Sequence, residues 1–178
     1  MIRLVLLVCV CFLSYAQVFN TGKVLRKGDT SIAGNISIHT SPSDLMLNIM
    51  GGYGLGDGAD LSARLGLFAG ETYFGMDIEY VMMNSSKSDF SLSGGFHTFG
   101  SFGLDATAMY SYELNSKSDV FVGFDSDIEF GSFGAFNPWI AVGMDYMFRN
   151  NMIFMVEGDI PLKSGLSTRI NLGIHYFL

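Results

Sequence analysis

The chain has 178 residues, enough for one domain with a substantial core, and 49% of them are hydrophobic while only 15% are charged. Acidic residues outnumber basic ones by 17 to 10, for a net charge of −7, which argues against nucleic-acid binding. After the first residues, no apolar run reaches the length of a membrane-spanning helix. Frequent glycine, few charges and positive mean hydropathy favour a transmembrane β-barrel, in which apolar residues are spread over alternating strands.

Residues 1–16 predict a secretory signal peptide. Arg3 supplies a short basic start, residues 4–13 form an apolar run, and Ser14 and Ala16 provide a small-x-small cleavage site. The alternative is a buried N-terminal strand or helix. Both cysteines of the chain lie in this segment, so the mature protein is predicted to have no disulfide, no thiol catalysis and no cysteine-based metal site.

The rest of the chain divides into an expected N-terminal periplasmic segment, residues 17–28, and a barrel, residues 29–178. Within the barrel, turn-forming clusters such as Ser41-Pro42-Ser43 and Gly56-Asp57-Gly58 separate strand-like segments. Each segment has about ten residues, the length that a tilted strand needs to cross a bilayer. They lie near 29–39, 44–54, 60–69, 71–82, 89–99, 102–114, 119–129, 137–148, 151–160 and 167–178.

These segments predict an all-β fold: a transmembrane antiparallel up-and-down β-barrel of ten strands, with eight as the alternative count. An even number of strands brings both termini to one side, as in bacterial outer-membrane barrels. Apolar residues alternate with small, polar or charged ones along the strands, so each strand has two different faces. A secreted lipocalin-like barrel with an apolar interior would alternate in the same way.

Two features of these faces favour lipid outside and a polar lumen inside. The apolar face carries more bulky side chains than the interior of a small barrel can hold. The polar face is mostly glycine, serine, asparagine and carboxylate, whereas a water-facing surface normally mixes both charge signs.

Five tyrosines predict an aromatic girdle at one membrane interface. They share the apolar face and lie near the C-terminal ends of even-numbered strands, which places them at one height. The alternative is that tyrosine is simply common in strands. The five are Tyr53, Tyr80, Tyr112, Tyr146 and Tyr176.

The polar face predicts a strongly acidic lumen wall, with Arg64 and Arg169 as its only strand cations and His97 and His175 as titratable groups. Pairing Arg64 with Asp77 and Arg169 with Glu157 leaves most carboxylates unpaired. Water in the lumen, bound cations or protonation would then offset the cost of burying them. Small inward residues, Gly66 and Gly75 among them, are expected to leave room for water. The predicted acidic wall comprises Asp77, Glu79, Asp105, Asp125, Asp127, Glu129, Asp145, Glu157 and Asp159.

No metal site and no cofactor are predicted. Asp125, Asp127 and Glu129 share one face of one strand, and oxygen-rich clusters suit Ca²⁺. Residues two apart along a strand, however, are separated by about 7 Å and would need ligands from neighbouring strands. A solvated acidic wall is therefore favoured over a metal site.

The C-terminal residues resemble the β-signal that the barrel assembly machinery recognises in outer-membrane proteins. The matching positions are Asn171, Gly173, Tyr176 and Leu178, where leucine replaces the usual terminal aromatic residue and Phe177 stands one place earlier. The segments LRKGDTSIAGNISI and GGYGLGDGADLSARLGL also look like small porin-family barrels of Bacteroidetes-type bacteria. This resemblance implies a bacterial outer-membrane location, with lipid, lipopolysaccharide and the assembly machinery as partners.

The resemblance carries no catalytic signature. Omptin proteases are ten-stranded barrels with aspartate and histidine at the outer rim, and His97 is expected opposite Asp105 near that rim. Omptin chemistry also depends on tall outer loops, whereas the outer connections predicted here are short. The chain is therefore predicted not to be an enzyme.

The main functional hypothesis is a narrow, water-filled, cation-preferring pore for small solutes. The alternative is a plugged barrel that serves as an envelope scaffold or surface-interaction protein, with residues 130–136 as its exposed apolar patch. A rim-site hydrolase and a soluble ligand-binding barrel are less favoured. The sequence leaves the solute, the partner and the number of copies open.

Overall fold

The computed structural model describes residues 22–40, 43–68, 71–130 and 135–178. The predicted signal peptide, residues 17–21 of the predicted 17–28 segment and residues 131–134 of the 130–136 patch lie outside the described residues. Among the residues described, no helix is long and apolar enough to cross a membrane.

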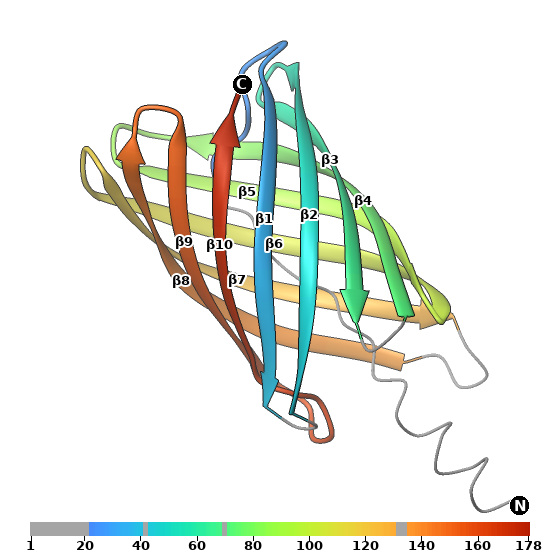
Figure 1. The fold of residues 1–178 in the computed structure, drawn as a ribbon. Coiled ribbons are helices and arrows are strands. Elements are labelled where there is room, and N and C mark those ends of the chain that lie inside the picture. The colour runs from blue at the N-terminus through green and yellow to red at the C-terminus, as the bar shows by residue number, and fades with distance from the viewer. Residues whose placement is uncertain (1–21, 41–42, 69–70, 131–134) are drawn as a thin grey trace, which may run out of the picture.

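Ten antiparallel strands form a closed barrel in which each strand pairs with its sequence neighbours and β10 pairs with β1 (Figure 1). The predicted all-β fold and the count of ten are confirmed, and every predicted boundary lies within two residues of the observed one. The strands are β1 (Thr30–Thr40), β2 (Ser43–Gly56), β3 (Ala59–Phe68), β4 (Glu71–Asn84), β5 (Ser88–Phe99), β6 (Ser101–Asn115), β7 (Ser118–Phe130), β8 (Ala135–Arg149), β9 (Met152–Pro161) and β10 (Arg169–Phe177).

The two faces of the strands have opposite environments, as the alternation predicts. On β1, buried residues such as Ser37 and His39 alternate with exposed ones such as Ile36 and Ile38. Large apolar side chains cover the outside of every strand; Leu67, for example, is 59% exposed. A soluble monomer rarely exposes such a continuous apolar surface. The lipocalin-like alternative, with its apolar face inside, is therefore wrong.

The hairpin turns define two rims. The proximal rim carries the C-terminus and the turn at Asp57, a non-glycine residue with a φ of 55° between two glycines that also have positive φ. At this rim the end of the chain is joined to the start of β1, because the backbone N–H of Leu178 donates to the carbonyl of Thr30 over 2.9 Å. At the opposite, distal rim, Gly100 alone joins β5 to β6, with a φ of 68° that a larger residue would strain.

Candidate functional site

The lumen wall is the part of the barrel where charged side chains gather. Ten of the described buried residues are Asp or Glu and two are Arg, so the interior is strongly acidic. Of the predicted wall, Asp105 and Glu129 keep 8% and 12% of their side chains exposed, and the rest are buried. Sequence reasoning missed Asp60, Asp89 and Asp119, because polar residues beside turns are expected whatever they face. The buried carboxylates are Asp60, Asp77, Glu79, Asp89, Asp119, Asp125, Asp127, Asp145, Glu157 and Asp159.

Arg169 is the centre of a buried polar network on the β7–β10 wall. Its Nε atom lies 3.1 Å from Asp159 Oδ2, and a terminal nitrogen lies 3.8 Å from Asp125. Its guanidinium carbon lies 4.3 Å from the ring centre of Trp139, a cation–π contact. Asn171 completes the network by donating from Nδ2 to Glu157 over 2.7 Å and to Asp159 over 2.9 Å.

The predicted partner of Arg169 is wrong. The register pairs Arg169 with Asp159 and places Asn171 opposite Glu157. The connection between β9 and β10 is centred on Ser164, not on Lys163. A shift of one residue in the centre of a hairpin moves each cross-strand partner by two.

The predicted pair between Arg64 and Asp77 is confirmed, with Arg64 donating to Asp77 over 2.5 Å. The residue directly across from Arg64 is Gly75, so the arginine reaches Asp77 along a diagonal. Ser62 also donates its hydroxyl to this carboxylate, at 3.4 Å.

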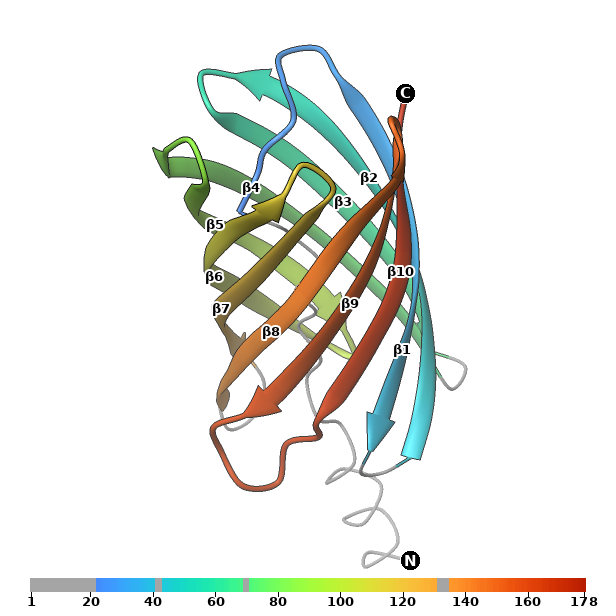
Figure 2. The same cartoon turned by 90° about the vertical axis from the view of Figure 1, so that its left-hand side faces the viewer.

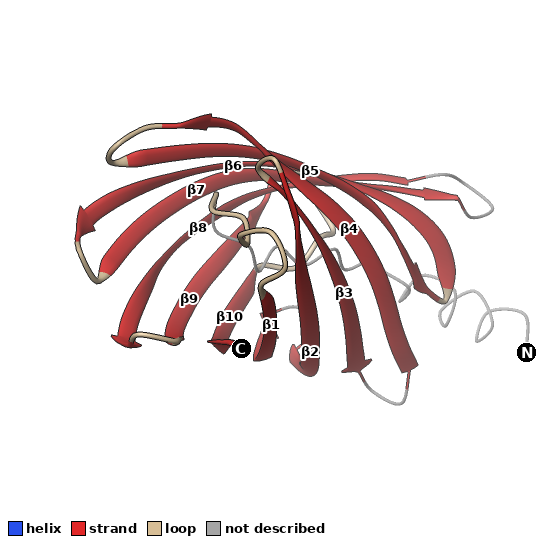
Figure 3. Cartoon of the chain, turned by 90° about the horizontal axis from the view of Figure 1, so that it is seen from above, coloured by secondary structure: helices blue, strands red, loops and turns tan. Residues whose placement is uncertain are grey.

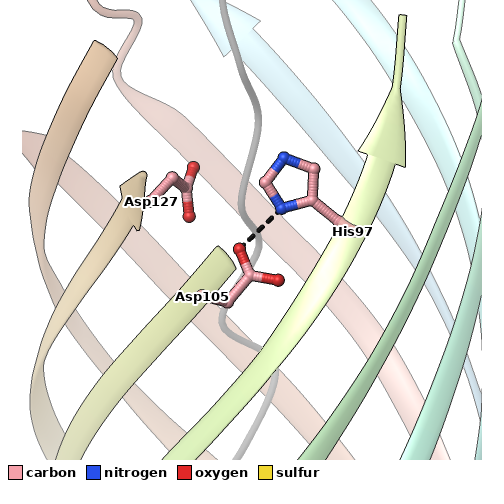
Figure 4. A group of neighbouring side chains, drawn as sticks. All are labelled: His97, Asp105 and Asp127. Carbon is pink, nitrogen blue, oxygen red and sulfur yellow. Dashed lines mark hydrogen bonds and ion pairs between the residues drawn. The ribbon is translucent and has the colours of Figure 1, made fainter. Parts of the chain in front are cut away.

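His97 meets Asp105 as predicted, again along a diagonal, because its direct cross-strand partner is Gly103. The Nδ1 atom lies 2.7 Å from Asp105 Oδ1 (Figure 4), and Nε2 lies 3.6 Å from Glu129 Oε1. The imidazole covers Gly103, where a Cβ atom would lie only 2.4 Å from the ring. The ring of Tyr73 stacks on it with centroids 5.6 Å apart.

A layer of apolar side chains crosses the lumen nearer the proximal rim, and the alternation did not reveal it. Its members come from β1 and β2 on one side and from β6 to β9 on the other, so it narrows the barrel from opposite walls. This layer, the methionine layer, comprises Ala33, Met50, Met109, Phe121, Ala141 and Met155.

The expectation that small inward residues leave room for water is wrong at Gly66 and Gly75. A Cβ atom at Gly66 would lie 2.4 Å from the Met46 side chain, and one at Gly75 would lie 2.7 Å from the Tyr73 hydroxyl. Neighbouring bulky side chains thus occupy the space above these glycines. These two glycines therefore make room for neighbouring side chains rather than for water.

The described part of the N-terminal segment, residues 22–29, lies across the proximal mouth (Figures 2 and 3). On one side it contacts β3, where the Leu25 N–H donates to Asp60 over 2.9 Å. On the other side it contacts β6 and β7: the Gly22 N–H donates to Ser111 over 2.7 Å, and Lys23 forms an ion pair with Asp119. Burial alone would lower the pKa of Lys23, but its hydrogen bond and attraction to Asp119 raise it.

A cavity of about 450 Å³ lies beside this segment within the proximal mouth. Acidic residues from several strands, Glu79 and Asp145 among them, line it together with Lys23 and His175. The methionine layer contributes Met50 and Met155 to the lining, so the cavity borders that layer. The arrangement can hold water and small cations at this end of the lumen.

The five predicted girdle tyrosines lie on the outer surface, each 36–48% exposed, at the proximal ends of β2, β4, β6, β8 and β10. Of the predicted assembly signal, Asn171 and Gly173 face inward and are buried, whereas Tyr176 and Leu178 are exposed.

No protein-family model matches the sequence, and no curated protein matches it either. Solved structures with similar folds are outer-membrane barrels. The NanC porin superposes with a TM-score of 0.61 at 8% identity, over 83% of this chain and all of the porin chain. An outer membrane channel from Pseudomonas putida F1 gives 0.58 at 10% identity, over 92% and 100% of the two chains. The KdgM porin gives 0.53 at 12% identity, over 82% and 98%. At these identities the likeness shows the fold alone: a ten-stranded barrel of the outer-membrane type.

Proposed function

We propose that this protein is a bacterial outer-membrane barrel that forms a narrow, low-conductance pore for small polar solutes and prefers cations. The observation that carries the proposal is the charge of the lumen, where ten buried carboxylates face two buried arginines. Such an excess lowers the energy of cations along the barrel axis and raises that of anions. The similar solved structures are two porins and an outer membrane channel, which supports the same class of function.

The path of water is proposed to follow the β1–β3 wall. Polar residues of this wall remain slightly exposed to solvent, by 7–9% of their surface: Asn35, Asn48 and Arg64. On the opposite wall, Asp159 and Asn171 have no exposed surface. Asn35 and Asn48 face each other across β1 and β2, and neither Nδ2 atom has a hydrogen-bond partner among the described residues. Buried amides normally bond to protein or to ordered water, so a file of water along this wall would satisfy both.

The barrel is proposed to sit in the outer membrane with its proximal rim in the periplasm. The apolar outer surface would face lipid and lipopolysaccharide, and the tyrosine row would lie at the periplasmic interface. The C-terminal residues would direct insertion through the barrel assembly machinery. Fractionation of cells that express the tagged protein tests the location: recovery in the soluble periplasmic fraction would overturn it.

The function is tested by single-channel recording in planar bilayers, with the mature protein refolded and its folding checked by the mobility of unheated samples on gels. We expect small, stable current steps and a reversal potential of the sign for cation selectivity. Replacing Glu79 by Gln and Asp145 by Asn should move the reversal potential towards zero. The control Asp57→Asn, in an exposed turn at the same rim, should leave it unchanged. A folded, inserted barrel that carries no current would overturn the pore proposal.

A second candidate function, a plugged barrel that acts as an envelope scaffold or surface-interaction protein, is favoured by two observations. The methionine layer crosses the lumen, and residues 22–29 lie across the proximal mouth. Apolar constrictions can close a pore by excluding water. The bilayer experiment separates the two functions, because only the scaffold is consistent with a folded barrel that never conducts.

We propose no catalytic role. The side chain of His97 is fully buried and Asp105 keeps only 8% of its side chain exposed, so a protein substrate could not reach this pair as it would reach an open rim site. Incubation of the folded barrel with peptide substrates should give no cleavage above that of a His97→Gln variant.

A further inference from the structure

Four polar side chains from three adjacent strands converge in the distal half of the lumen. His97 comes from β5, Asp105 from β6, and Asp127 and Glu129 from β7 (Figure 4 shows the first three). One ligand-type atom from each of His97, Asp105 and Asp127 lies within 4.8 Å of the other two. Glu129 approaches the same imidazole from its other side, at 3.6 Å from Nε2.

The two nitrogens of His97 differ in what they contact. Nδ1 is engaged by Asp105, whereas Nε2 is buried and forms no hydrogen bond to any described residue. Glu129 Oε1, its nearest ion-pair atom, is also buried without a hydrogen-bond partner. An imidazole whose Nδ1–H is held by a carboxylate presents its Nε2 lone pair outward, which is the usual arrangement of a metal-binding histidine. The carboxylate of Asp105 thus fixes the orientation of the ring.

The charge of the cluster also favours a cation. Three carboxylates surround one imidazole in a place where His97 has no solvent exposure, and uncompensated buried carboxylates are costly. Arg64 is committed to Asp77, and Arg169 to Asp159. A divalent ion bound among these carboxylates would offset their negative charge.

Ligand type and spacing narrow the class of ion. One imidazole with several carboxylate oxygens suits Zn²⁺ and similar divalent transition metals better than Ca²⁺, which binds oxygen ligands alone. Metal–ligand bonds of about 2.1 Å place ligand atoms at most about 4 Å apart. His97 Nε2 and Glu129 Oε1 lie 3.6 Å apart, within this limit, so the two atoms are close enough to bind one ion.

We propose that His97 Nε2, Asp127 and Glu129 form a binding site for a divalent transition-metal ion, that Asp105 orients the imidazole from Nδ1, and that the ion enters on the side of the partly exposed Glu129. The inference does not depend on the pore proposal, because a plugged barrel could hold the same ion. The sequence-based expectation of no metal site considered the carboxylates of one strand only, whereas the residues proposed here come from three adjacent strands. The competing explanation is a proton shared among the carboxyl groups.

The site is tested by equilibrium dialysis of the folded, EDTA-treated mature barrel in detergent against Zn²⁺, with bound metal measured by mass spectrometry. We expect one equivalent of Zn²⁺, and an affinity at least tenfold lower for His97→Gln and for Glu129→Gln. The matched control is His175→Gln, which removes another inward histidine that lies near the proximal mouth. X-ray absorption at the zinc edge should show one imidazole and otherwise oxygen ligands.

Two results would overturn the site. One is the absence of zinc from the folded wild-type barrel, which a shared proton predicts. The other is equal zinc retention by wild type and both cluster variants, which would place the metal elsewhere. Should His97→Gln fail to fold on the gel assay, the comparison rests on Glu129→Gln, because the partly exposed Glu129 is the easier of the two to replace.

Discussion

Replacing Arg169 by methionine tests whether the lumen wall is a buried electrostatic network. Arg169 is 1% exposed, and its side chain contacts Asp159 at 3.1 Å and Asp125 at 3.8 Å. Methionine keeps much of the apolar stem but leaves both carboxylates buried without their cation. Removing one partner of a buried ion pair costs roughly 3–5 kcal/mol of folding free energy. The expected loss is therefore large for a single substitution.

The assay is urea unfolding in lipid vesicles, followed by the fluorescence of Trp139 and by gel mobility. Trp139 is the only tryptophan of the chain, and the Arg169 guanidinium lies over its ring, so the probe reports on the network itself. The control Arg149→Met removes an exposed arginine and should change stability by no more than about 0.5 kcal/mol. Adding Asp159→Asn to Arg169→Met should restore part of the lost stability, because one stranded charge is removed.

A loss for Arg169→Met as small as that of Arg149→Met would refute the reasoning. It would mean that water reaches Asp125 and Asp159 freely and replaces the guanidinium. That outcome would move the proposed water path from the β1–β3 wall to the β7–β10 wall.

Three further predictions follow from the inner wall, the proximal mouth and the C-terminus. Gly143→Ala places a Cβ atom 2.4 Å from the Phe121 ring and should lower the free energy of unfolding by about 1–3 kcal/mol in the same assay. The control Gly51→Ala, which has open space around it, should leave stability nearly unchanged. Equal effects of the two substitutions would contradict the packing described. Deleting residues 22–26, which include Lys23 and Leu25, should raise single-channel conductance, and an unchanged conductance would show that these residues do not restrict the mouth. Tyr176→Ser should slow insertion by purified assembly machinery relative to Tyr53→Ser, and equal rates would argue against a C-terminal signal.

The strand count, the strand boundaries and the outward direction of the apolar face were predictable from the sequence. Each depends on a local property: the alternation of residues along one strand and the turn chemistry at Gly56-Asp57-Gly58 and similar sites. The Arg64–Asp77 contact was also predicted, although Gly75 and not Asp77 lies directly opposite Arg64, because the long arginine side chain reaches Asp77 along a diagonal.

The contents of the lumen were only partly predictable. Met109 and Phe121 lie on the mainly polar face, and alternation alone does not show whether such exceptions bend outward or fill the interior. Glycines opposite them were interpreted as empty space, although each one makes room for a neighbouring side chain. The partner of Arg169 was predicted wrongly because one residue in the β9–β10 connection decides the register.

The sequence by itself thus determined an antiparallel barrel, with ten strands favoured over eight, an apolar exterior and an acidic interior, because strand period and side-chain polarity are properties of neighbouring residues. Only the tertiary structure decided which interior residues of strands farther apart meet. The His97 cluster joins β5 to β7, and the methionine layer joins β1 and β2 to β6–β9. Such contacts depend on the registers of several strand pairs and on the tilt at which the sheet closes, and these are set by the whole barrel.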